Sequence, residues 1–538
     1  MIKLFLFLSL ILASLDAKIT LDEISSKPTS RAKDFMIWQY LKQDISNTQV
    51  KIAYKQSTKR NRKLKNLYAK RIKDPYIVYR DKCRKKRNLF VIEDKKCFKI
   101  ALTPYKTLAM SHEERKKLAK KVDSKNFIKL LKIQNEPYKA SAYKKYPADV
   151  VLKMFINTTA SHRRDNLNIK LDKKLINSLV SSNKIHYFIK MIINNKKLDK
   201  LQESLILLDS PKLNGNDNFR LALFHLQNNR KKSAIKHLHM ALKKYKKRIE
   251  LDKTKFWLYL ITENEKYINL LLKSEGINIY TLFAYEKKHK KVTNYFTTLP
   301  TENIKSSVNL KNPFEWETLR LKIKKTPKEK LSDLVSQYQS QCLLPVQSHI
   351  VERLEAYKIH SFIMPYDKYL KDVSTDDKAL IYAIMRQESN FIPCALSSSF
   401  ALGLMQIMPF LTDAISKKMK LKTTYNDMFD PETNLKYAVK HIKWIQKSLY
   451  HPLFLAYAYN GGLNFFRKHL KTGAFSSKKY EPFLSIELMK NGQSREYGKK
   501  VLANYVMYKK ILGEKVSIIG LFQTLKDPIQ TSRYGKQN

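Results

Sequence analysis

The stretch that decides the fold of this chain runs from residue 374 to residue 409 and reads STDDKALIYAIMRQESNFIPCALSSSFALGLMQIMP. It begins with Ser374, a residue type that often caps a helix, and Asp377 stands three positions later, where a capping-box acid belongs. An apolar face follows at helical spacing, made of Leu380, Ile381, Ile384 and Met385. The pattern predicts a buried helix that ends before Pro393.

Glu388 extends this apolar face, because it falls seven residues after Ile381 and four after Ile384. Partial desolvation at such a position raises the pKa of a carboxyl group and keeps it protonated near neutrality. A protonated carboxyl is what a general acid needs to protonate a departing glycosidic oxygen. Taken alone, a solvated glutamate at a helix end, paired with Arg386 or a nearby lysine, is the commoner explanation.

The residues after this helix favour the catalytic interpretation. Gly403 permits close approach of the backbone, and Gln406 offers a donor and an acceptor to sugar hydroxyls and amides. Met408 is suited to lie against a sugar ring, and Pro409 is typical of the first position of a new helix.

Two further segments belong to the same pattern. Asp430 and Pro431 form a cap and first-position pair, which predicts a helix that runs through Leu449. Residues 456–461 then read AYAYNG and predict a short helix that ends at Asn460, with Tyr459 at a loop edge. Such a tyrosine is either a carbohydrate contact or ordinary core filling.

Together these motifs resemble the soluble lytic transglycosylases, the Slt family of peptidoglycan-cleaving enzymes. The resemblance rests on 386–389 (RQES), Ser397, 403–409 (GLMQIMP) and 458–461 (AYNG), in that order. It covers roughly Tyr366 to Gly513, and it implies a helical, lysozyme-like catalytic domain. In larger family members an N-terminal α-superhelix forms a ring that carries this domain.

Glycine usage agrees with a helical first part. Only Gly215 and Gly276 precede residue 366, although the chain has 11 glycines. Few positions there suit turns with positive φ, which argues against a β-rich fold. Apolar stripes recur instead, at 175–193, 201–208, 256–272 and 350–359, and residues 221–242 read as helix, turn and helix.

We therefore expect an all-α protein in three parts. Residues 1–17 are predicted to be a signal peptide, 18–365 an α-superhelical solenoid with linker helices, and 366–538 the lysozyme-like domain. The sequence leaves open whether the superhelix closes into a ring.

The resemblance also implies a mechanism and a set of site residues. Glu388 would act first as acid and then as base, so that the muramic C6 hydroxyl closes onto C1 and leaves a 1,6-anhydro sugar. Substrate-binding positions would be Ser397, Gln406, Met408, Tyr459, Asn460 and Gln493. No cofactor or metal is expected, and no pair of cysteines or Cys/His cluster has metal-ligand spacing.

Two positions depart from the family pattern. Phe400 stands where the family usually has glycine, three residues after the motif serine, and this change is expected to reshape the loop or the fit of a glycan. Gln493 replaces the usual glutamate of the cleft wall, which removes a carboxylate but keeps a hydrogen-bonding side chain of equal length.

Composition bounds the remaining possibilities. The chain has 538 residues, 43% of them hydrophobic, which excludes a disordered protein, and no apolar run after residue 15 is long enough to span a membrane. The first residues, MIKLFLFLSLILASLDA, are typical of a secretory signal peptide. This predicts export to the periplasm without a transmembrane segment in the mature protein.

The formal charge of +57 favours an anionic partner. Peptidoglycan carries carboxylates on its stem peptides, whereas the export signal and the lack of a recognisable module argue against nucleic acid. In an oxidising compartment Cys83 and Cys97 are placed to close a short loop, but four cysteines allow three connectivities.

Three alternatives stay open. A lysozyme-type muramidase would combine Glu388 with a later acid, Asp413, Asp427 or Asp430, to activate water. An inactive wall-binding scaffold draws support from Phe400 and Gln493. A nucleic-acid-binding protein is suggested by charge alone.

Overall fold

The computed structural model describes residues 18–306, 308–476 and 478–527, and the predicted signal peptide lies outside them. Apart from two strands of two residues each, the regular structure of these residues is helical, which confirms the predicted all-α class. None of the helices there is both long and apolar enough to cross a membrane. The chain divides into two compact units, and each consists of two separate stretches of sequence.

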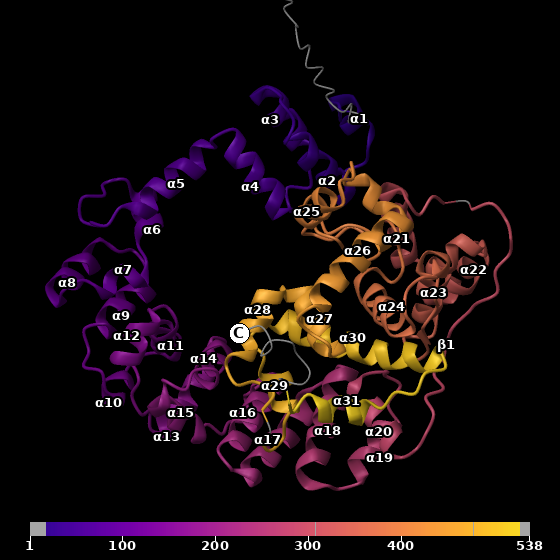
Figure 1. Cartoon of the computed structure of the whole chain (residues 1–538). Coiled ribbons are helices and arrows are strands. Elements are labelled where there is room, and N and C mark those ends of the chain that lie inside the picture. The colour runs from indigo at the N-terminus through magenta and orange to yellow at the C-terminus, as the bar shows by residue number, and fades with distance from the viewer. Residues whose placement is uncertain (1–17, 307, 477, 528–538) are drawn as a thin grey trace, which may run out of the picture. The chain divides into compact units, whose positions relative to one another are not determined.

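The first unit joins residues 18–74 to residues 295–444 (Figure 1). Its elements are α1 (Leu21–Ser26), α2 (Arg31–Tyr40), α3 (Asn47–Lys55), α4 (Arg62–Arg71), β1 (Tyr295–Phe296), α21 (Pro313–Lys325), α22 (Leu331–Ser336), α23 (Leu344–Leu354), β2 (His360–Ser361), α24 (Thr375–Ser389), α25 (Pro409–Met419) and α26 (Pro431–Gln446). The two strands pair in parallel, with Tyr295 opposite His360. Helix α2 packs on α21 and thereby joins residues 18–74 to the second stretch of this unit.

The second unit joins residues 75–294 to residues 445–527. Its first stretch contains α5 (Pro75–Lys85), α6 (Lys95–Ala101), α7 (Pro104–Leu108), α8 (His112–Lys121), α9 (Lys125–Ile133), α10 (Ala140–Tyr143), α11 (Ala148–Ile156), α12 (Ala160–Asp165), α13 (Lys173–Ser178), α14 (Ile185–Ile193), α15 (Asp199–Ile206), α16 (Gly215–Gln227), α17 (Lys231–Lys244), α18 (Arg248–Thr262), α19 (Lys266–Leu272) and α20 (Ile279–Lys287). Its second stretch contains α27 (Pro452–Gly461), α28 (Leu463–Leu470), α29 (Phe483–Leu488), α30 (Gly492–Ile511) and α31 (Ile518–Thr524).

Consecutive helices of residues 75–294 pack against their neighbours along the chain, as in a superhelix (Figure 1). The predicted helix–turn–helix of residues 221–242 is confirmed as α16 and α17. Both helices bury their apolar faces, which include Leu221, Phe224 and Leu238. A continuous core extends from Leu130 to Phe224.

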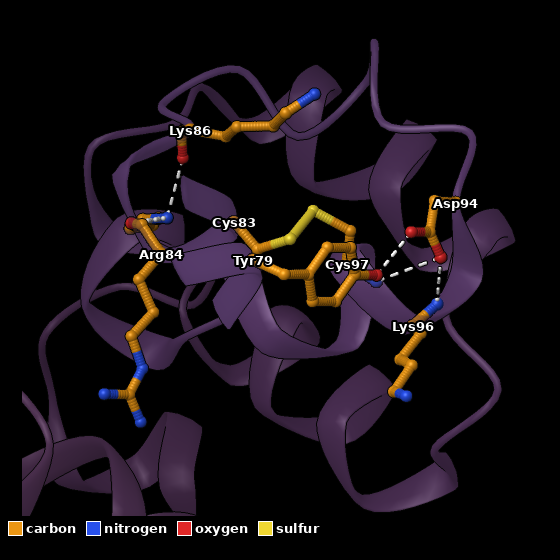
Figure 2. The surroundings of a disulfide bond; sticks show 8 residues. Tyr79, Cys83, Arg84, Lys86, Asp94, Lys96 and Cys97 are labelled. Atoms are coloured by element: carbon orange, nitrogen blue, oxygen red, sulfur yellow. Dashed lines mark hydrogen bonds between the residues drawn. A yellow bond between two sulfur atoms is a disulfide. The ribbon is translucent and has the colours of Figure 1, made fainter. Parts of the chain in front are cut away.

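Cys83 and Cys97 form a disulfide that joins α5 to α6, which settles the connectivity (Figure 2). The thiols of Cys342 and Cys394 are free. Asp94 caps α6 by accepting from the amide of Cys97 at 3.2 Å, and it also accepts from the hydroxyl of Tyr79. Both cysteines are buried in a small hydrophobic core, separate from the one described above, together with Leu89, Phe98 and Leu118.

Four predicted apolar segments are divided or end earlier than the pattern indicated. The stripe at 175–193 is divided between α13, which ends at Ser178, and α14, which begins at Ile185. The stripe at 256–272 is divided between α18 and α19, because Glu263 adopts a left-handed conformation with φ 57°. The stripe at 350–359 ends with α23, since Ala356 and Tyr357 also have positive φ. The helix expected to reach Leu449 ends at Gln446, because the chain turns there and starts α27 at Pro452.

Candidate active site

Glu388 lies in the last turn of α24, and the predicted start of this helix is confirmed. The hydroxyl of Ser374 accepts from the amide of Asp377 at 3.3 Å, and the helix buries Leu380, Ile381, Ile384 and Met385. Asn390 and Phe391 both have positive φ, so the chain turns away directly after the helix. Glu388 is partly buried and lines a pocket of about 360 Å³.

Ser397 and Gln406 line the same pocket as Glu388. The Ser397 Oγ accepts hydrogen bonds from the backbone amides of Ser399 at 3.2 Å and Ala401 at 2.9 Å. Because these bonds use the oxygen, the hydroxyl hydrogen can still be donated to a ligand.

Gln406 braces the turn that carries it. Its Nε2 donates to the carbonyl oxygens of Ala395 at 3.0 Å and Gly403 at 2.9 Å. The side-chain oxygen is therefore the atom suited to accept from a ligand. Gly403 has φ +74°, and a Cβ on it would lie 2.1 Å from the carbonyl oxygen of Met428. Only glycine fits that position without a shift of the backbone.

Asn434 of α26 holds the other side of this turn and is fully buried. Its Nδ2 donates to the carbonyl oxygens of Leu402 at 3.0 Å and Met428 at 2.8 Å, and its Oδ1 accepts from the amide of Met405 at 2.9 Å. Every hydrogen-bonding group of this buried amide except one lone pair is thus used, and together the bonds fix Leu402 and Met405 to α26 and to Met428.

Arg386 and Met408 contribute to the structure around the pocket and are not in its described lining. Arg386 donates to the Glu352 carboxylate at 3.0 Å and to the carbonyl of Ser361 at 2.6 Å. It therefore joins α24 to α23 and the following strand. Met408 is the N-cap of α25, which begins at Pro409 as predicted, and it is not among the described residues that line the pocket.

The pocket lining that the sequence did not predict includes five charged or aromatic side chains from distant helices: Arg31, Trp316, Glu317, Arg320 and His349. They come from α2, α21 and α23, which the sequence placed in the superhelix. The carboxylate of Glu317 accepts from the backbone amides of Arg31 at 3.0 Å and Ala32 at 3.2 Å, and it lies 3.5 Å from the Arg320 guanidinium. No local motif marks Arg31 and Glu317, because they contact each other across more than 280 positions of the sequence.

Glu317 is the second carboxylate of this pocket, among the residues described. Asp413 accepts from the Tyr425 hydroxyl at 3.0 Å, and Asp427 accepts from the amide of Thr424 at 2.7 Å. Asp430 caps α26 by accepting from the amide of Thr433 at 3.0 Å, as predicted. None of these three aspartates is in the described lining of the pocket.

Phe400 shows how the chain accommodates its departure from the family glycine. Its φ is +58°, the left-handed region in which glycine is favoured, and its side chain is fully buried. The ring packs on Phe35 and Trp38 of α2, with centroid separations of 5.3 Å and 5.5 Å.

The remaining predicted positions lie in the second unit. Tyr459 and Asn460 are in the last turn of α27, and the Asn460 Oδ1 accepts from the Ser494 hydroxyl at 3.0 Å. Gln493 is exposed in the first turn of α30. How these three residues are placed toward Glu388 stays a prediction.

Below the first turn of α30, a buried ionic cluster packs this helix on α20 and α29. Lys499 donates at 3.1 Å to Glu487, which also accepts from the Tyr280 hydroxyl, and it lies 3.0 Å from Glu496. Gly498 permits this packing on its other side, because a Cβ there would lie 2.2 Å from the Tyr457 ring.

Comparison with known proteins gives three findings. Residues 368–481 match the family model of the transglycosylase SLT domain. The soluble lytic murein transglycosylase of Escherichia coli K12 is 26% identical over 182 residues, which is 33% of this chain and 28% of the relative. A membrane-bound lytic murein transglycosylase C from Sodalis glossinidius is 37% identical over 97 residues, 16% of this chain and 27% of the relative.

The match thus spans little more than a quarter of the length of these relatives. Among solved structures, the 70 kDa soluble lytic transglycosylase SLT70 from Escherichia coli has a TM-score of 0.51 at 16% identity, over 94% of this chain and 84% of that one. The lytic transglycosylase Slt from Pseudomonas aeruginosa has a TM-score of 0.52 at 13% identity, over 90% of this chain and 82% of that one. The fold that the sequence predicts, superhelix plus lysozyme-like domain, is confirmed by these structures, and the resemblance is confirmed by the match of residues 368–481 to the transglycosylase SLT domain.

Proposed function

We propose that this protein is a lytic transglycosylase, which cleaves the β-1,4 bond between N-acetylmuramic acid and N-acetylglucosamine in peptidoglycan. The observation that carries the proposal is the position of Glu388. It ends a buried apolar helix face and lines a pocket with Ser397 and Gln406, inside the segment that matches the SLT domain.

In the proposed reaction, the protonated Glu388 donates its proton to the glycosidic oxygen as the bond from that oxygen to C1 breaks. The resulting carboxylate takes the proton of the C6 hydroxyl of the same muramic residue while that oxygen bonds to C1. The product is a 1,6-anhydro sugar, and no water is consumed. An internal hydroxyl held near C1 acts at high effective molarity, so a second catalytic carboxylate is not required.

The state of Glu317 supports the single-acid reaction. Its carboxylate already accepts two backbone amides of α2 and is near Arg320, which favours a structural role. The Ser397 hydroxyl and the Gln406 side-chain oxygen are suited to hold the acetamido groups of the substrate. Met408, Tyr459, Asn460 and Gln493 are proposed as the remaining substrate-binding positions.

Export and charge belong to the same proposal. We infer that residues 1–17 direct the protein to the periplasm, where the net charge of +57 would attract the carboxylates of peptidoglycan stem peptides. The proposed chemistry needs neither a metal nor a cofactor.

The test is mass spectrometry of the soluble products from purified sacculi. The protein without residues 1–17 is compared with Glu388→Gln, Glu317→Gln and a control, Glu432→Gln, whose side chain is exposed at the start of α26. We expect anhydromuropeptides from the wild type, Glu317→Gln and the control, and none from Glu388→Gln.

Each other outcome selects another function. Products with hydrated reducing ends, lost in both Glu388→Gln and Glu317→Gln, would establish a muramidase that uses two carboxylates. Binding of sacculi without any release by the wild type would establish a wall-binding scaffold. Salt-dependent binding of DNA without binding of sacculi would establish a nucleic-acid-binding protein.

A further inference from the structure

The loop that carries Ser397 is held from outside the SLT domain. Residues 396–400 follow the end of α24, and Ser398 and Ser399 are exposed. Within the loop, Ser397 and Phe400 are joined by a backbone hydrogen bond of 3.0 Å. Phe400 adopts its positive φ without the conformational freedom of glycine, which costs free energy unless surrounding contacts compensate.

Three side chains from residues 18–74 donate to three carbonyl oxygens of this loop. Arg31 Nη1 donates to Leu396 at 2.8 Å, Asn61 Nδ2 to Ser398 at 2.9 Å, and Lys63 Nζ to Ser399 at 2.7 Å. Two of the donors are charged, and hydrogen bonds from charged groups are the stronger class.

An aromatic contact completes the hold on the loop. Phe400 packs on Phe35 and Trp38, and the Lys42 ammonium lies 3.6 Å from the centre of the Trp38 ring. Burial of the Phe400 ring offsets the free-energy cost of its positive φ, which is unfavourable for residues other than glycine.

Helix α2 is itself anchored to the pocket wall. Its first two amides donate to Glu317 of α21, and Arg31 and Glu317 both line the pocket of Glu388. The same helix therefore contacts both the loop of Ser397 and the pocket wall at Glu317.

We propose that residues 18–74 are a positioning element of the active site, in which Arg31 and Phe35 fix the loop 396–400 and thereby place Ser397 beside Glu388. This inference rests on the proposed function for its catalytic consequence. Arg31 is a positioning residue here, because it acts through the Leu396 carbonyl and the serine that follows.

The test compares Arg31→Ala and Arg31→Lys with a matched control, Arg62→Ala, in which an exposed arginine of α4 is removed from the same segment. We expect Arg31→Ala to lower kcat on soluble glycan chains about 10- to 100-fold with a smaller change in KM. Arg31→Lys should recover part of the loss, because it keeps one charged donor. The control should keep the wild-type rate.

Hydrogen exchange supplies a readout that does not depend on activity. The amides of Ser397, Phe400 and Ala401 bond within the loop, so peptides that cover residues 396–402 report its order. In Arg31→Ala and in Phe35→Ala we expect exchange of these amides to rise about tenfold, while peptides from the core of α24 stay unchanged.

A double-mutant cycle separates positioning from general instability. Phe400→Gly removes the aromatic contact and also the conformational cost of a positive φ, so Phe35→Ala should change loop exchange much less in that background than in the wild type. Equal effects of Phe35→Ala in both backgrounds would overturn the positioning role. So would loop exchange in Arg31→Ala that is no faster than in the control Arg62→Ala. A wild type without activity would refute the proposed function only, since loop exchange still tests the contact.

Discussion

The buried side-chain amide of Asn434 donates a 3.0 Å hydrogen bond to the carbonyl oxygen of Leu402. Through this bond, α26 holds the turn on which Gln406 faces the pocket. With its further bonds to Met405 and Met428, the side chain satisfies three backbone groups at once.

Asn434→Ala should therefore destabilise the protein strongly. It leaves a buried amide and two buried carbonyl groups with one partner fewer each, at a cost of about 1–3 kcal/mol for each group left unsatisfied. We expect a total loss of about 3 kcal/mol in the free energy of unfolding, measured by urea denaturation, and a parallel loss of activity. Ser398→Ala, at an exposed position, is the control; equal denaturation midpoints for the two variants would contradict the prediction.

Gly403→Ala should destabilise the folded protein, because the added methyl group has no room. The new Cβ would meet the Met428 carbonyl oxygen at a position with φ +74°, so the backbone has to move. Strain at such a position costs about 1–3 kcal/mol before the clash is counted. Gly473→Ala makes the comparison sharp, because Gly473 has the same φ with no atom within 4 Å of the added carbon. Unfolding midpoints should fall further for Gly403→Ala than for Gly473→Ala.

Removing the disulfide should loosen one part of the second unit. Cys83 and Cys97 are 14 residues apart, and closing a loop of this length contributes about 3 kcal/mol in the chain-entropy model. In Cys83→Ala/Cys97→Ala we expect faster amide exchange in α5, α6 and α8. Exchange in α24 should stay the same, and a uniform increase over the whole chain would contradict a local role.

The pair of Lys499 and Glu487 should tolerate double replacement better than single replacement. Both side chains are buried, and Glu487 also accepts from Tyr280, so Lys499→Met removes the ammonium group that donates to this buried carboxylate at 3.1 Å. Breaking a buried pair costs about 3–5 kcal/mol, whereas replacing both partners by apolar groups is often close to neutral. We expect Lys499→Met/Glu487→Leu to unfold at a higher urea concentration than Lys499→Met.

Low pH should lower the free energy of unfolding, because the Glu496 carboxylate in the same ionic cluster becomes protonated. Burial alone would raise the pKa of this carboxyl, but the charges of Lys499 and Arg495 outweigh it and lower the pKa to about 2. Because the unfolded value is higher, near 4.3, the stabilisation is complete above that pH and disappears as the pH falls toward 2. Glu496→Gln should show a smaller loss of stability over this range in denaturation curves, and an identical pH dependence would contradict the assignment.

Local sequence signals predicted most of the helix starts in residues 374–461, whereas contacts with distant residues explain what these signals missed. Ser374, Pro409 and Asp430 marked helix starts correctly, because a cap or a proline acts within three residues of itself. The positive φ of Glu263 left no trace in the sequence, since glycine is absent there. The sequence could not identify Arg31 as a pocket residue, because the Leu396 carbonyl to which it donates is 365 positions away.

The first unit is assembled from two stretches that more than 200 residues of the second unit separate. Helix α2 finds α1 and α4 within its own stretch, but its contacts with α21 and with the Ser397 loop require residues that lie more than 270 positions further along the chain. Contacts of such high sequence separation form late and slowly. The pocket of Glu388 therefore cannot be completed until residues 18–74 meet the second stretch of their unit.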